Sequence, residues 1–108
     1  MGAWAQEGED DPCGKPTDKK LLKQLVEADG TRNAGERHQK LKALLEEWPD
    51  CAECLFLTGE SAYLRAKAGA ANFQAGIGYL EQLRDRCPDH GSTMYYYLGH
   101  MYYAQSRY

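Results

Sequence analysis

Apolar residues recur at spacings of three and four along most of the chain, and no stretch alternates between apolar and polar residues as a half-buried strand would. The first clear stripe lies within residues 18–29, where Thr17 is placed to cap a helix and Gly30 to end it. Asn33 is placed to cap a second helix, with Glu36 three residues later in a capping-box arrangement. The two stripes are Leu21, Leu22, Leu25 and Val26, then Leu41, Leu44, Leu45 and Trp48.

Two prolines mark the ends of later helices. Pro49 ends the second helix and Pro88 the fourth, because the residue before a proline is pushed out of the helical region. Asp50 is placed to cap a third helix and Ser92 a fifth, whose pattern still runs at Tyr108, so we expect the natural domain to continue. The sequence therefore predicts an all-α fold of about five helices. The remaining apolar positions are Leu55, Phe56, Ala62, Tyr63 and Leu64, then Phe73, Ile77, Leu80 and Leu83, then Met94, Tyr95, Leu98, Met101 and Tyr102.

The N-terminal residues lack this periodicity. Gly, Ala, Gln and acidic residues dominate residues 1–12, so we expect a flexible acidic tail over residues 1–16 and a helical domain over residues 17–108. The stretch Ala3-Trp4-Ala5-Gln6 has the small-x-small form of a signal-peptidase site, although no charged and apolar regions precede it. Two interpretations stay open, the remnant of a processing point and an arbitrary tail.

Composition narrows the class of partner. The chain has 43% hydrophobic and 27% charged residues, and no apolar run approaches the ~18 residues that a membrane span needs. The net charge is −3, from 13 basic and 16 acidic residues, and four of the acids lie in residues 1–12. Elsewhere the charges nearly balance, 13 against 12, which argues against nucleic acid as a partner because such a domain needs a basic face.

The two prolines also introduce an internal repeat. Gly59 lies ten residues after Pro49 and Gly99 eleven after Pro88, so the glycines are 40 residues apart, close to a 34-residue helix–turn–helix unit with an insertion. With Pro88 upstream, the segment Tyr95-x2-Leu98-Gly99-x2-Tyr102 resembles the tetratricopeptide repeat. The resemblance covers residues 18–108 and implies a right-handed superhelical stack of antiparallel helix pairs. The middle repeat departs from it at Ala62, where a tyrosine is usual, and at Gly76, where an alanine is usual.

A narrower resemblance rests on three short motifs. They are Pro12-Cys13-Gly14 with Asp18-Lys19-Lys20, then Cys87-Pro88-Asp89, then Met94-Tyr95-Tyr96-Tyr97-Leu98-Gly99. In these motifs the chain is similar to the N-terminal repeat region of a group of Gram-negative envelope proteins, in which a propeller-like module and a peptidoglycan-binding domain related to outer membrane protein A follow. Some members of that group serve in type IX secretion and gliding. The resemblance implies an exported, periplasmic, outer-membrane-associated protein, with a cytoplasmic location as the alternative.

Four cysteines fall along one edge of the predicted helix pairs. As disulfides, Cys13 with Cys87 would pin the N-terminal arm and Cys51 with Cys54 would close a small loop, although four cysteines allow three connectivities and need an oxidising compartment. Zinc would take Cys51, Cys54, Cys87 and His90 as two ligand pairs. A redox pair at Cys51-x2-Cys54 would use the lowered thiol pKa of a helix start, but a thioredoxin-like site needs strands. Unpaired thiols are the fourth interpretation.

Catalytic signatures are absent from the sequence. It has no Gly-rich phosphate loop, no HExxH pair and no Gly-x-Ser-x-Gly motif. We expect His38 and His90 to be exposed and His100 to be a hydrogen-bonded packing residue among tyrosines. We therefore predict that the protein is not an enzyme and uses no cofactor.

Tyrosine is concentrated in the fifth helix, which holds five of the eight tyrosines within residues 95–103. In tetratricopeptide repeats the first helix of each pair lines a concave groove, so the resemblance implies a partner-binding groove on the third and fifth helices. The positions that hold a terminal carboxylate in chaperone-binding repeats are here Leu57, Thr93 and Tyr97, which favours an apolar or basic ligand instead. The implied groove residues are Glu53, Phe56, Glu60, Tyr63, Tyr96, Tyr97, His100 and Tyr103.

The expected function is a protein–protein interaction scaffold of the bacterial envelope that binds a segment of a secretion or cell-wall component. The alternative is a metal- or redox-dependent protein that uses the cysteine edge. A third possibility is a structural spacer whose tyrosines cover a further helix pair, in which case the exposed last helix would promote self-association.

Overall fold

The computed structural model describes residues 13–105, so the expected cleavage motif and most of the acidic tail lie outside the described residues. Within residues 13–105 all regular structure is helical, which confirms the all-α prediction with five helices and no strand. None of these helices is long and apolar enough to cross a bilayer. The helices are α2 (Lys19–Asp29), α3 (Ala34–Glu47), α4 (Ala52–Lys67), α5 (Gln74–Arg86) and α6 (Ser92–Ala104).

The N-terminal cap of α3 is the predicted one, but those of α2 and α4 are not. The Asn33 side chain accepts a hydrogen bond from the Glu36 N–H, whereas α2 is capped by Asp18 and not by Thr17. Asp18 is the residue with extended backbone directly before the first helical turn, which is the position a cap must occupy. At α4 the turn after Trp48 extends one residue further than expected, so the cap is the Cys51 sulfur and not Asp50.

Helix α6 also differs at both ends from the prediction. Ser92 is its first residue and not its cap, because the chain turns at Gly91, where φ is 155° and a side chain would be strained. The helix ends at Ala104, followed by Gln105 as its C-terminal cap, earlier than the pattern predicted, and residues 106–108 lie outside the described part of the chain.

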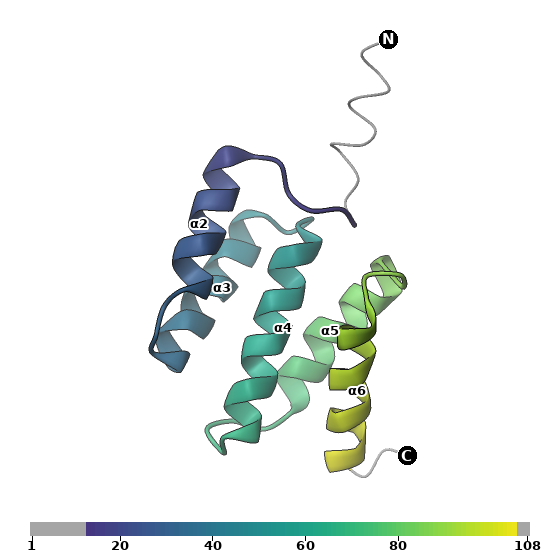
Figure 1. Ribbon diagram of the computed structural model, residues 1–108. Coiled ribbons are helices and arrows are strands. Elements are labelled where there is room, and N and C mark those ends of the chain that lie inside the picture. Colours follow the sequence, from purple (N-terminus) through teal and green to yellow (C-terminus); the bar gives the residue numbers. More distant parts are fainter. Residues whose placement is uncertain (1–12, 106–108) are drawn as a thin grey trace.

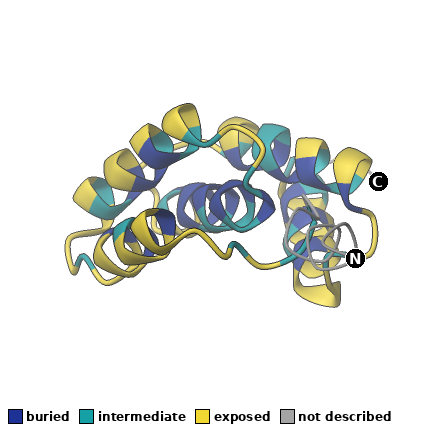
Figure 2. Ribbon diagram, turned by 90° about the horizontal axis from the view of Figure 1, so that it is seen from above, coloured by how far each residue is buried: buried dark blue, intermediate teal, exposed yellow. Residues whose placement is uncertain are grey.

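Consecutive helices pack against one another in two layers. Figure 1 shows α2, α4 and α6 in front and α3 and α5 behind, and α4 contacts α3, α5 and α6. Viewed along the helices in Figure 2, α4 lies set back between α2 and α6 and is the most deeply buried helix. Side chains of α2, α4 and α6 therefore share one surface, which we call the front face.

Two apolar clusters hold the layers together. One lies between α2, α3 and the start of α4, and the other joins α4, α5 and α6. Tyr95 was expected in the second cluster, but its ring is exposed and its hydroxyl donates to the Pro88 carbonyl oxygen at 2.7 Å. The largest fully buried side chains are Leu41, Leu55, Ile77, Leu80, Leu83, Met94 and Met101.

The two repeat glycines have different surroundings. A Cβ atom added to Gly59 would lie 2.5 Å from Leu80 Cδ2, so α4 and α5 approach as closely as a glycine allows. A Cβ atom added to Gly99 would meet nothing within 4 Å among the described residues. A close helix approach that requires glycine is therefore seen at Gly59 and not at Gly99.

Candidate functional site

A group of aromatic rings in contact with one another joins α4 to α6, and we call it the aromatic cluster: Phe56, Tyr63, His90, Tyr96, Tyr97 and His100. At its centre the Tyr97 ring lies 4.7 Å from that of Tyr63 and 6.2 Å from that of Phe56, measured between centroids. The rings of Tyr96 and His100 lie 4.7 Å apart at its outer edge. Residues one turn apart on α6 thus reach α4 as one continuous aromatic surface.

Polar contacts fix the orientation of these rings. The Tyr97 hydroxyl donates to Glu60 Oε2 at 2.7 Å, and burial together with this carboxylate raises the pKa of Tyr97 to about 12. The Tyr63 hydroxyl and His100 Nδ1 are hydrogen-bonded at 3.1 Å, so the expected packing role of His100 is matched. Tyr97 therefore stays a neutral hydrogen-bond donor at any physiological pH.

The implied groove residues do not all lie in one place. Seven of them belong to or border the aromatic cluster, but Tyr63 is buried and supports the stack without facing solvent. Tyr96 is 58% exposed, so most of its surface faces solvent. Tyr103 lies 74% exposed on the outer side of α6. Glu53 borders the cluster at its other end, where its Oε1 atom is 3.7 Å from His90 Nε2.

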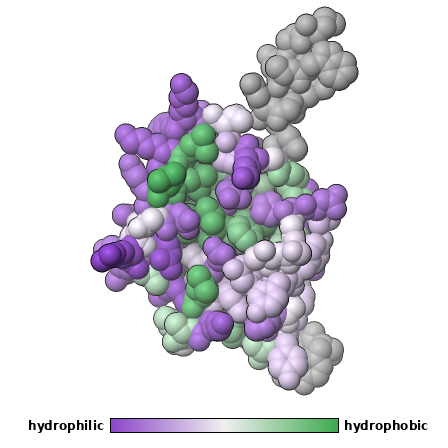
Figure 3. All heavy atoms as spheres, in the orientation of Figure 1, coloured by the Kyte–Doolittle hydropathy of each residue, from purple (hydrophilic) through white to green (hydrophobic). Residues whose placement is uncertain are grey.

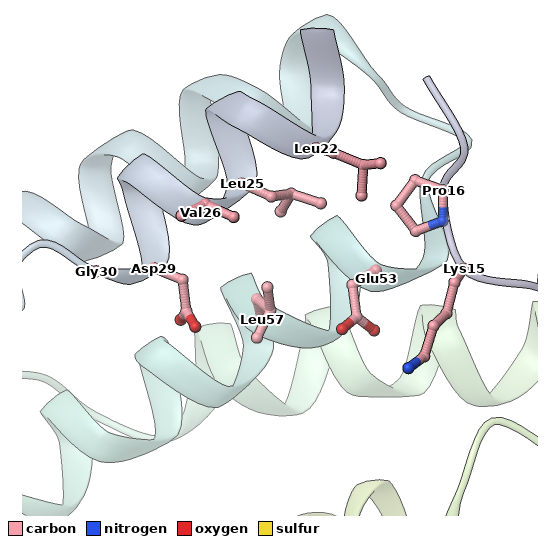
Figure 4. Close-up of a pocket in the computed structure, with 9 residues that line it drawn as sticks. All are labelled: Lys15, Pro16, Leu22, Leu25, Val26, Asp29, Gly30, Glu53 and Leu57. Atoms are coloured by element: carbon pink, nitrogen blue, oxygen red, sulfur yellow. The ribbon is translucent and has the colours of Figure 1, made fainter. Parts of the chain in front are cut away.

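A hollow on the same face as the aromatic cluster was not predicted. It lies between α2 and α4, has a cavity volume of about 450 Å³ and is closed at one end by the segment before α2. Figure 3 shows apolar side chains running down this face from α2 onto α4, and Figure 4 shows the lining from within. We call it the α2–α4 pocket, and its lining residues are Lys15, Pro16, Leu22, Leu25, Val26, Asp29, Gly30, Glu53 and Leu57.

Sequence reasoning missed this pocket because it placed four apolar residues of α2 on one buried stripe. The buried face of α2 is in fact Leu21, Leu25 and Ala28, with spacings of four and three. Leu22 and Val26 form a second pair one residue further on, 40% and 73% exposed. A run of adjacent apolar pairs on a short helix is the signal that could have indicated two faces in place of one.

The four cysteines form two disulfides, Cys13 with Cys87 and Cys51 with Cys54. The first ties residues 13–16, expected to be part of the tail, to the end of α5. The zinc site of the alternative interpretation is not formed, because its three cysteines are divided between the two disulfides. A disulfide sulfur is not a thiolate ligand. Within residues 13–105 no cluster of three or more His, Cys, Asp or Glu side chains is placed to hold a metal.

The prediction for His38 was wrong, because this histidine is buried between α3 and α4. Its Nδ1 atom lies 2.7 Å from Ser61 Oγ, and the Ser61 hydroxyl donates to the Thr58 carbonyl oxygen at 2.8 Å. The only hydroxyl proton of Ser61 therefore points away from His38, so the imidazole donates and does not act as a base toward Ser61. Burial lowers the pKa of His38, and the nearby Arg65 and Lys42 lower it further.

In comparisons with known proteins, no family model, no curated protein and no solved structure matches this chain.

Proposed function

We propose that this protein is an interaction module that binds a segment of a partner protein across the face formed by α2, α4 and α6. The observation that carries the proposal is the aromatic cluster, whose outer ring, Tyr96, is more than half exposed. Tyrosine supplies a large rigid contact surface with a polar hydroxyl, and it is enriched among the residues that dominate binding energy at interfaces.

The rings of the cluster are prepared for binding before a partner arrives. Tyr97 is held by Glu60 and stacked on Tyr63, so little side-chain freedom remains to be lost on association. The acids Glu53 and Glu60 lie at this surface, which favours a partner segment with apolar and basic side chains over an acidic one. This agrees with the absence of a basic carboxylate-binding set at Leu57, Thr93 and Tyr97.

The proposal places the protein in an exported compartment, and the bacterial periplasm is the compartment we favour. The support is the pair of disulfides, since such bonds persist in oxidising compartments and are rare in the cytosol. The resemblance to the repeat region of outer-membrane-associated envelope proteins points the same way. Protein recovered from its native compartment should therefore show no free thiols when it is alkylated without reduction and its intact mass is measured. Four alkylated cysteines would remove this argument for export.

Binding can be tested without knowing the partner. We would select peptides from a random phage-displayed library on the oxidised protein and measure their dissociation constants by fluorescence anisotropy. Tyr96→Ala should weaken binding about tenfold or more, because it truncates the exposed ring of the cluster. Since Tyr96 is exposed, the variant should keep the wild-type circular dichroism spectrum.

Tyr95→Ala is the matched control for this test. Tyr95 is the neighbouring residue on α6 and is also exposed, but its hydroxyl contacts Pro88 and not the cluster. Its substitution should change the dissociation constants less than twofold by comparison. If the library gives no binders, or if both substitutions weaken binding equally, the front face is not the binding surface.

A further inference from the structure

We propose that the α2–α4 pocket is a second binding site on this face, a socket for an apolar side chain flanked by basic residues in the partner segment. We further infer that the Cys13–Cys87 disulfide holds the end wall of this socket in place. The inference rests on the proposed function, because it names the chemistry of the segment that the face binds. The residues on which this inference rests lie outside the aromatic cluster.

The floor of the socket is apolar and open to solvent. In Figure 4, Leu22, Leu25 and Val26 project from α2 on the side that faces α4, with Leu22 beside Pro16, and Val26 is 73% exposed although it lines the hollow. The buried face of α2 is already supplied by Leu21 and Leu25, so the exposed pair is not needed for the core. Single exposed apolar residues are common, but a concave group of them is typical of a binding site.

The rim of the socket is acidic. Asp29 stands near one end of the apolar floor and Glu53 on the α4 side, and Figure 4 shows both carboxylates beside the opening. Lys15 is the only basic residue among those that line the pocket. A ligand that carries cations on both sides of an apolar side chain matches this arrangement, whereas an anionic ligand would be repelled.

The socket is continuous with the aromatic cluster, which favours a chain segment over a small molecule. Glu53 lines the pocket and also lies 3.7 Å from His90, whose ring is 5.1 Å from that of Phe56. An extended segment that places one side chain between α2 and α4 therefore continues onto the cluster without leaving the face. A small apolar molecule would make no use of this connection.

The end wall of the socket comes from the segment before α2. Lys15 and Pro16 stand across the opening at the start of α2 in Figure 4, and this segment contains no helix or strand. It is tied at both ends, because α2 begins at Lys19 and the Cα atom of Cys13 is 5.6 Å from that of Cys87. A wall held in this way is pre-organised, and binding then costs less ordering of the chain.

The test is a methyl-group NMR titration of the oxidised protein with the peptide acetyl-Gly-Lys-Leu-Lys-Gly-amide, taken to its solubility limit. We expect saturable shifts of the Leu22, Val26 and Leu57 methyl signals. Two control peptides replace both Lys by Glu, or the Leu by Ser, and neither should move these signals. If the signals do not move with the first peptide, or move equally with all three, the proposal is wrong.

Matched variants test the floor and the wall separately. Val26→Gln should weaken binding of the Lys-Leu-Lys peptide about tenfold, while Leu64→Gln, at an exposed leucine outside the pocket lining, should leave it unchanged. Cys13→Ser should weaken it about fivefold by freeing the wall, and Cys51→Ser, which removes the other disulfide, should not. Equal effects of the two cysteine variants would show that the wall is not held by Cys13.

Failure of the socket can be told apart from failure of the proposed function. The library-selected peptides report on the whole face, and their loss of affinity in Tyr96→Ala is independent of Val26. If those peptides bind through Tyr96 while Val26→Gln has no effect on any peptide, the proposed function stands and the socket does not. If no selected peptide depends on Tyr96 but the Lys-Leu-Lys peptide shifts the methyl signals of the pocket, the socket stands and the proposed function of the aromatic cluster does not.

Discussion

Three side chains form a buried polar network between α3 and α4. His38 donates to Ser61, Ser61 donates to the Thr58 carbonyl oxygen, and the Thr58 hydroxyl lies 2.7 Å from the Cys54 carbonyl oxygen. Within residues 13–105 no buried side-chain nitrogen or oxygen lacks a hydrogen-bond partner. The network is satisfied only while His38 is neutral in the fold, because a second proton on its ring would add a buried charge next to Arg65 and Lys42.

The stability of the protein should therefore fall as the pH is lowered. Burial holds the pKa of His38 below its ordinary value of 6.5, so the unfolded chain takes up the proton first. The stability that neutral His38 contributes is fully present above pH 6.5 and is lost as the pH falls toward the lowered pKa. The free energy of unfolding should change with a slope of at most about 1.4 kcal/mol per pH unit.

The measurement is the free energy of unfolding in urea across this pH range, for the wild type and for His38→Gln. Glutamine can still donate to Ser61 but does not titrate, so the difference between the two proteins isolates His38 from the other acids and histidines. The variant should lose less stability on acidification than the wild type. Parallel pH curves for the two proteins would show that His38 is not the group responsible.

At the scale of the helices, the closest approach is between α4 and α5 at Gly59. An alanine Cβ there would lie 2.5 Å from Leu80 Cδ2 and 2.8 Å from its Cγ, and Leu80 is fully buried. Overpacking of this kind costs about 1–3 kcal/mol, while the higher helix propensity of alanine returns about 0.5–1 kcal/mol. Gly59→Ala should therefore lower the free energy of unfolding by about 1 kcal/mol.

Gly99 is the matched position for this test, since it is the repeat equivalent on α6 and a Cβ atom added there would meet no described residue within 4 Å. Gly99→Ala should raise the free energy of unfolding by about 0.5–1 kcal/mol, because only the helix-propensity effect operates there. Urea denaturation of both variants gives the comparison. Similar effects at the two positions would mean that the spacing of α4 and α5 is not set by Gly59.

The helices were predictable because their periodicity and their stop signals agree, but three of their N-terminal caps, those of α2, α4 and α6, were not. A cap is decided by which residue has extended backbone directly before the first turn, and at α4 this depends on how the turn at Pro49-Asp50 continues. The burial of His38 was also missed, because its partner Ser61 lies on another helix. Local patterns thus give the elements, while partners distant in sequence decide individual side chains.

The whole front face combines elements that are distant in sequence, which explains how much of the site could be predicted. Five of the six residues of the aromatic cluster were among the groove residues that the tetratricopeptide resemblance implied, whereas His90 was not, because it lies in the turn before α6 and not on a helix. The α2–α4 pocket was not predicted, because its end wall comes from the segment that the Cys13–Cys87 disulfide carries to the far end of the stack. The pairing itself was one of several alternatives, since sequence alone cannot choose among three connectivities.

The two disulfides should differ in their effect on the whole molecule. Cys13–Cys87 spans 74 residues and Cys51–Cys54 spans 3, and in the chain-entropy model loops of these lengths stabilise the fold by about 4 and about 2 kcal/mol. Cys13→Ser and Cys51→Ser are comparable changes, because each leaves a buried partner thiol that packs as a small apolar group. Serine at position 51 also supplies a side-chain oxygen that can replace the Cys51 sulfur as the cap of α4.

We therefore expect Cys13→Ser to lower the free energy of unfolding about twice as much as Cys51→Ser, measured in urea under oxidising conditions. The loss should fall mainly on the attachment of the arm, so amide hydrogen exchange in residues 14–18 should increase more than in α4. A larger loss for Cys51→Ser would contradict this account, since it would mean that the short bridge and its cap, and not the long closure across the stack, secure the molecule.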